Sequence, residues 1–273
     1  MTSISLSQVQ ALFGVASSGA SSGSAAEAIP ALKRATADGA EAKGIAREQK
    51  DQVNISALAQ FRTALGKADT IEKALSDPRV LKVLAPALGL PDQVDNVAML
   101  RKALLSDPTD TKSLASQLGS SWKAAAQTLG VYKTGLDGLK DDALVAKLSD
   151  AYLKYQYRTG LDEQQAGMAN ALYFLDNAAG ATDVYTILGN AALRKVVTTA
   201  LGLPDAMVVQ SVETQGRAVT SRLKLESLQD PKQVRKLAER YLINAANAAA
   251  GSATSGSSDP FAAITNLAVT IRV

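Results

Sequence analysis

The chain contains neither cysteine nor histidine. The absence of cysteine excludes disulfides, thiolate nucleophiles and zinc–thiolate sites. The absence of histidine removes the commonest general base and the commonest ligand of transition metals. Any catalytic site would therefore have to be built from carboxylates, lysine, tyrosine or serine.

Long hydrophobic runs and an excess of one charge are also missing. No continuous apolar stretch reaches the roughly 18 residues that suggest a membrane span, so we expect no membrane-spanning helix. The net charge is +3 and the basic residues are spread along the chain, which argues against a dedicated nucleic-acid surface. The amino terminus lacks the pattern of a secretory signal peptide, although residues 1–26 carry no charged side chain.

The most distinctive feature that is present is a repeated hexapeptide. ALGLPD occurs at residues 87–92 and again at residues 200–205. The similarity extends upstream at the same spacing and pairs Leu75 with Leu188, Val83 with Val196, and Phe61 with Phe174. This internal sequence repeat predicts a duplicated helical unit.

Each copy of the hexapeptide reads as a helix–stop–helix corner. Asp77 and Pro78 supply an N-cap and a proline at the first helical position. Gly89 is expected in the left-handed conformation that ends a helix, and Pro91 prevents the helix from continuing. In the second copy Asn190 takes the place of the capping aspartate. This structural role accounts for the motif without a binding role.

The apolar residues follow the helical period, and the fold class we predict is all-α, with two tandem copies of a multi-helix unit packed into one body that shares an interior. The predicted domains are a low-complexity tail plus polar helix (1–53), a duplicated helical domain (54–243, with units at about 54–130 and 167–243), a flexible linker (244–258) and an apolar C-terminal segment (259–273). Both ends of the chain carry apolar residues in alternation, at 3–7 and 269–273, so each end could pack on the body, pair with the other end or contact another subunit.

Several helix boundaries follow from capping residues. Asn54 is expected to cap the first strong amphipathic helix, and Asp107 with Pro108 is expected to begin the helix that carries Leu114 and Trp122. The ten or so extra residues of the second unit predict one long helix over about 205–225. Asp230 is expected to cap a helix with a capping-box glutamine three residues later.

No catalytic or metal-binding pattern is present among the residues that remain. The charged candidates are ordinary pairs, Glu41/Lys43, Asp141/Asp142 and Asp162/Glu163, and adjacent carboxylates on a helix face different directions. The group Tyr152, Tyr155 and Tyr157 could stack on a ligand, but tyrosines at this spacing usually pack half-buried. We therefore predict no enzyme activity, no catalytic, cofactor-binding or metal-binding residues, and no cofactor.

The central block ALYFLDNAAGATDVYTILGNAALRKVVTTALGLPD, together with DPRVLKVLAPALGLPD in the first half, resembles a bacterial family of unknown function often encoded among flagellar genes. The resemblance covers about residues 54–243 and implies no activity and no site residue. What it does imply is a connection with the flagellum. An uncharged leader rich in serine and small residues and an apolar carboxyl end are similar to those of proteins exported through the flagellar channel.

Three functions remain open. The first is a non-enzymatic flagellum-associated protein, exported and assembled through its terminal segments, with other flagellar subunits or further copies of itself as partners. The second is a cytoplasmic helical binding module, such as a chaperone or regulator of flagellar assembly. The third is a small-molecule-binding domain that uses a cleft between the two units. The expected location is the flagellum or the medium for the first function and the cytoplasm for the second.

Overall fold

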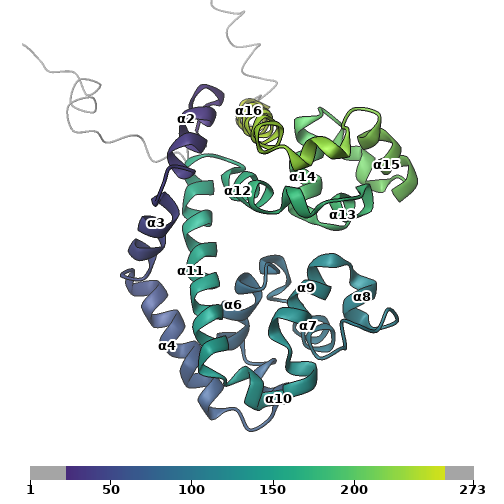
Figure 1. Ribbon diagram of the computed structural model, residues 1–273. Helices are drawn as coiled ribbons and strands as arrows, with labels where there is room; N and C mark the ends of the chain where they lie inside the picture. Colours follow the sequence, from purple (N-terminus) through teal and green to yellow (C-terminus); the bar gives the residue numbers. More distant parts are fainter. Residues whose placement is uncertain (1–22, 256–273) are drawn as a thin grey trace, which may run out of the picture.

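The computed structural model describes residues 23–255, and every regular element in that range is a helix (Figure 1). The prediction of an all-α fold is confirmed. No helix in this range is both long and apolar enough to cross a membrane, as expected from the hydropathy. The alternating segments 3–7 and 269–273 lie outside the described residues.

The helices form two lobes (Figure 1). The first lobe follows the N-terminal helices in the chain and surrounds a core that includes Phe61, Leu84 and Leu100, all fully buried. Its elements are α4 (Gln52–Lys67), α5 (Ile71–Ala74), α6 (Pro78–Ala87), η1 (Pro91–Gln93), α7 (Val97–Leu104), α8 (Leu114–Leu118), α9 (Ser120–Leu129) and α10 (Val131–Leu139).

The second lobe combines the C-terminal half with the first described helix. Its core includes Phe174, Val196 and Leu242, and α2 (Ala25–Ala35) adds Ala28 and Leu32 to it. The other elements are α12 (Met168–Asn177), η2 (Ala178–Gly180), α13 (Val184–Gly189), α14 (Ala191–Ala200), η3 (Asp205–Val209), α15 (Val212–Thr220), η4 (Leu225–Gln229) and α16 (Pro231–Ser255).

Two helices connect the lobes. The long helix α11 (Asp142–Gln164) buries Leu148 and Tyr152 in the first core, and its last turns reach the second lobe, where Leu161 packs against the second core. Helix α3 (Ala40–Glu48) lies against α11. The buried residues form two separate clusters, whereas the duplication had led us to expect a shared interior.

The two ALGLPD corners have the same local structure. Gly89 and Gly202 adopt φ values of 75° and 63°, the left-handed conformation that the repeat predicts. In the first corner the N–H of Leu90 donates to the Ala85 carbonyl at 2.9 Å, and Leu203 donates to Thr198 at 2.9 Å in the second. This is the Schellman pattern. Both corners are followed by a 3₁₀ helix, η1 or η3, but the two differ in length, and duplication of the complete units stays a prediction.

The capping predictions are confirmed for three helices. The Asp77 carboxylate accepts from the N–H of Arg79 at the start of α6, and Asn190 accepts from Leu193 at the start of α14. Asp230 accepts from the N–H of Lys232 at the start of α16. In each case the side chain satisfies a donor that has no partner within the helix.

Three other boundaries were predicted wrongly. Helix α4 begins at Gln52 with Asp51 as its cap, while Asn54 is buried and donates to Glu48. The segment after Asp107 forms turns, and the helix that follows is capped by Ser113. The span 205–225 is not one helix, because Ser211 caps a separate helix α15 between two 3₁₀ segments.

Both predicted terminal regions are more helical than expected. The single polar helix of 27–52 is two helices, α2 and α3, separated by a turn at Gly39 with φ 70°. Helix α2 is amphipathic rather than polar, since Leu32 is fully buried in the second core. The predicted linker 244–258 is helical up to Ser255, because α16 continues through its alanine-rich end.

The corner glycine gives a direct test of backbone strain. Gly89→Ala should lower the free energy of unfolding by about 1–2 kcal/mol, because the Cβ atom of alanine clashes with the backbone at positive φ. The same change at Gly66, in the last turn of α4 with open space around its Cβ position, should raise stability by about 0.4–1 kcal/mol, because alanine reduces the freedom of the unfolded chain. Urea unfolding of the two variants measures both signs, and equal effects would contradict the Schellman assignment.

Candidate functional site

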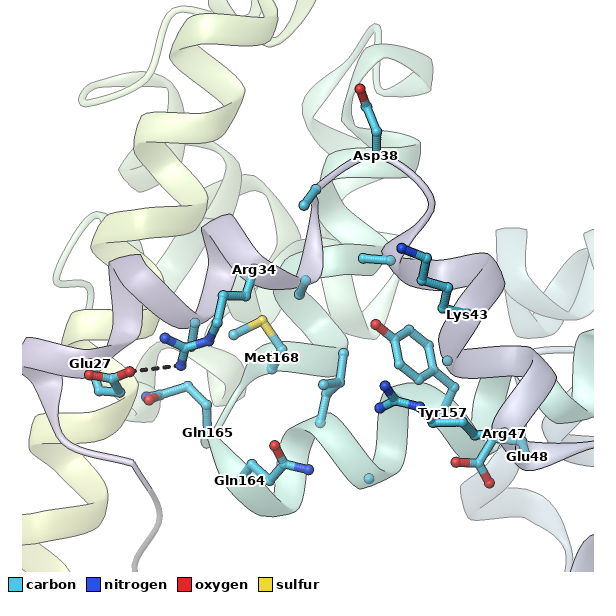
Figure 2. A pocket seen from close by; sticks show the side chains of 17 residues that line it. Glu27, Arg34, Asp38, Lys43, Arg47, Glu48, Tyr157, Gln164, Gln165 and Met168 are labelled. Atoms are coloured by element: carbon cyan, nitrogen blue, oxygen red, sulfur yellow. Dashed lines mark hydrogen bonds and ion pairs between the residues drawn. The ribbon is translucent and has the colours of Figure 1, made fainter. Parts of the chain in front are cut away.

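A groove lies beside α11. It has a volume of about 540 Å³ and lies between α2 and α3 on one side and the last turns of α11 on the other (Figure 2). Arg34, Glu27 and Gln165 lie at one end, and Arg47 and Glu48 at the other. The groove therefore belongs to the junction of α2, α3 and α11 and not to a cleft between the two predicted units.

Close packing of α3 on α11 forms one wall of the groove. Gly44 faces the ring of Tyr157, and a Cβ at position 44 would lie only 2.1 Å from a ring carbon. Glycine is therefore required for α3 to approach α11 this closely. The turn at Gly39 joins α2 to α3, and both helices border the same groove (Figure 2).

The rim of the groove carries charges of both signs, while part of its floor is apolar. Arg34 pairs with Glu27 at 2.7 Å, and Lys43 and Arg47 extend from α3 on either side of Tyr157 (Figure 2). Leu161 and Met168 contribute apolar atoms to the floor. A lining of this kind suits a segment with apolar side chains and a polar backbone.

Burial raises the pKa of the Tyr157 hydroxyl, and the negative charge of Glu41 raises it further, while Arg47 and Arg158 act in the opposite direction. The phenol consequently stays protonated at neutral pH and can donate a hydrogen bond. It is not suited to act as a general base there.

An ion-pair network lies next to the groove. Arg158, only 9 % exposed, bonds to Glu41 on α3 at 2.9 Å and to Asp176 on α12 at 2.5 Å. Lys154 contacts the same two carboxylates at 2.8 and 3.4 Å. The network therefore ties helices from both sides of α11 to it. Charge-assisted bonds of this kind orient the helices as well as stabilise them.

The Glu41 carboxyl responds to this environment in two opposite ways. Partial burial raises its pKa, but hydrogen bonds from Lys154 and Arg158 and their positive charges outweigh burial, so the pKa lies below its ordinary value of 4.5. Glu41 is thus ionised at neutral pH. Its role is to hold α3 in place.

Gln165 is the unusual polar residue of the groove. It is 2 % exposed, and its Oε1 atom is buried without a hydrogen-bond donor among the described residues. Its Nε2 donates to the carbonyl of Gly23 at 3.3 Å, and the N–H of Gly23 donates to the Gln164 carbonyl at 3.0 Å. The described chain consequently begins at the edge of the groove.

The residues singled out from the sequence have mostly structural roles. Asp141 caps α11, and Asp162 accepts from the N–H of Ala169. Tyr152 is buried, and its hydroxyl accepts from Gln156 at 2.6 Å. Tyr157, by contrast, lines the groove.

The sequence did not predict the groove, because the α2 side of it lies in a segment expected to be a polar helix. The one available signal was the spacing of Ala28, Leu32 and Ala35, which places three apolar residues on one helical face. Within residues 23–255 no three acidic side chains come together in a way that could hold a metal ion.

Comparison with known proteins places the chain among proteins without an assigned role. The family described as "Protein of unknown function (DUF1217)" matches residues 87–234. The crystal structure of protein AGR_C_984 from Agrobacterium tumefaciens is similar, with a TM-score of 0.66 and 22 % sequence identity, over 82 % of this chain and 94 % of that one. That likeness supports the fold alone. No protein with a curated description matches significantly.

The ion-pair network predicts that stability falls more when Arg158 is replaced than when an arginine of an exposed ion pair is replaced. Arg158→Met should lower the free energy of unfolding by about 2 kcal/mol, because two carboxylates lose their buried partner. Arg34→Met makes the same change in a single, exposed pair and should cost less than about 1 kcal/mol. Chemical unfolding of both variants measures the contrast, and similar losses would mean that the network contributes nothing beyond a surface pair.

The lowered pKa of Glu41 predicts a pH dependence of stability. The folded state holds the proton of Glu41 less tightly than the unfolded state does, so the contribution is complete above pH 4.5 and is lost as the pH falls through the folded pKa. The difference in unfolding free energy between the native chain and Glu41→Gln should therefore shrink on acidification. Urea titrations at a series of acidic pH values measure it, and a constant difference would rule out the linkage.

Proposed function

The chain belongs to the DUF1217 family, whose function is unknown, and from that premise we propose that it is a non-enzymatic protein that acts through protein–protein contacts of its terminal segments. The proposed setting is the bacterial flagellum, which the sequence resemblance suggests, with export through the flagellar channel. Other flagellar subunits or further copies of the chain are the proposed partners.

The observation that carries this proposal is the position of the two ends of the described chain. Helix α2 packs along α16, and the guanidinium of Arg235 near the start of α16 donates to the hydroxyl of Thr36 just after α2. This contact places the end of α2 at the start of α16. Because the two helices also pack along each other, they must be antiparallel. The start of α2 therefore lies beside the later turns of α16, near Ala246, which is buried.

Both ends of the described chain, Gly23 and Ser255, consequently lie toward one end of the molecule, where α2 and α16 are found in Figure 1. Beyond Ala246, α16 continues to Ser255, about 13 Å at 1.5 Å per residue. The segments beyond these ends, 1–22 and 256–273, include apolar residues such as Leu12, Phe13 and Phe261. Two apolar segments that start close together can contribute to a single contact surface, which supports assembly through the termini.

A second candidate is a helical binding module that stays in the cytoplasm and holds a client protein. The groove beside α11 favours it, because the groove offers a peptide an apolar floor and two cations, Lys43 and Arg47, that form no ion pair within residues 23–255. Small-molecule binding is the third candidate, and the same groove would be its site.

Cell fractionation separates the first two candidates. We expect the chain in the medium or in purified flagella when the flagellar export apparatus works, and in the cytoplasm when it does not. Replacing Ile4, Leu6, Leu12 and Phe13 by serine in the full chain should abolish self-association measured by sedimentation velocity, because it removes the apolar surface of one end. Cytoplasmic retention in both strains, together with a monomeric native chain, would reject the proposal in favour of the binding module.

A further inference from the structure

The groove beside α11 has features of a site that a peptide segment would complete. Leu161 is half-buried in its floor, between charged rims, and Met168 lines the same groove but is almost fully buried. At about 540 Å³ it falls in the range of sites that enclose a ligand. It is formed by α2, α3 and α11 together, so its shape depends on the α3–α11 contact of Gly44 with Tyr157.

The end of the groove also has an unsatisfied hydrogen-bond acceptor. Buried polar atoms in folded proteins nearly always have partners. Oε1 of Gln165 is buried without one, and it faces Gly23, where an added Cβ would lie 2.3 Å from it. A backbone N–H from a chain that passes this point is the donor that fits the position.

The chain itself passes this point. The described residues begin at Gly23, which is bonded to Gln164 and Gln165 at the groove's edge. Phe13 precedes Gly23 by ten positions, which gives a reach of up to about 33 Å. The floor of the groove along α11, from Tyr157 to Gln165, spans only about 12 Å. The apolar residues of the amino-terminal segment can therefore reach the whole groove.

We propose that the groove binds Leu12 and Phe13 of the same chain. Residues 1–22 carry no charged side chain, so placing Leu12 and Phe13 between the charged rims leaves no charged side chain without solvent or a partner. The short tether from Gly23, rich in serine, glycine and alanine, gives the segment a millimolar effective concentration, which favours its own groove over that of a second copy. The inference rests on the proposed function, because Leu12 and Phe13 belong to the terminal segment that is proposed to assemble, and their binding in the groove competes with that assembly.

The absence of cysteine allows a direct test in the full chain. Gly14→Cys combined with Lys43→Cys places one thiol beside the apolar pair and one on the groove's rim. A short thiol-reactive crosslinker should join them within one chain. Gly14→Cys with Lys102→Cys, on α7 of the first lobe, is the matched control and should give no crosslink.

Two glycines give a paired test of groove occupancy. Gly160 lines the groove and its Cβ position meets nothing within 4 Å, so Gly160→Leu fills the groove without a clash. Gly66→Leu makes the same change at an exposed, open position of α4 outside the groove. The crosslink should be lost in Gly160→Leu and in Leu12→Ser with Phe13→Ser, and retained in Gly66→Leu.

Mixing tagged and untagged chains identifies which chain supplies the segment. A crosslink confined to single chains supports the proposal. A crosslink between tagged and untagged chains would overturn it and make a second copy the occupant, and no crosslink would overturn occupancy altogether. Because the crosslink is read in the isolated protein, its failure is distinct from a failure of self-association or export.

Discussion

The position of one buried arginine decides how the helices beside α11 are arranged. The two hydrophobic cores share no residue: Ile45 of α3 packs on the first core, whereas Phe174 of α12 belongs to the second. Arg158 bonds to one carboxylate from each of these helices, and Lys154 supports both contacts. Since a buried guanidinium without its carboxylates is costly, this set of ion pairs limits how far either helix can move.

The groove depends on that arrangement. Glu41, one of the two carboxylates, lies in α3 just before Lys43 and Gly44, which border the groove. A shift of α3 away from α11 would break the ion pair and open the groove together. The amino-terminal part of the chain is therefore held by two kinds of contact, since α2 is buried in the second core and α3 combines the ion pair of Glu41 with apolar packing of Ile45 on the first core. Both contacts leave the first described residue at the groove's end.

Local sequence signals predicted the local structure well at positions where only one residue could end or begin the helix. Gly89 and Gly202 end helices, Asp77 and Asn190 begin them, and the all-α class follows from the apolar period. Signals failed where two residues compete for one role, as when Asp51 rather than Asn54 caps α4. The groove could not be predicted, because it depends on the long-range contact between Gly44 and Tyr157 and on α2 joining a core formed by the other end of the chain.

The contact between Gly44 and Tyr157 also constrains how this surface can change over evolutionary time. Any side chain at position 44 would collide with the ring, so the two positions cannot vary independently while α3 keeps its place. Relatives that replace this glycine should carry a small residue in place of the tyrosine, and their grooves should be correspondingly wider. The residues at positions 44 and 157 together therefore indicate whether another member of the family has a groove of the same shape.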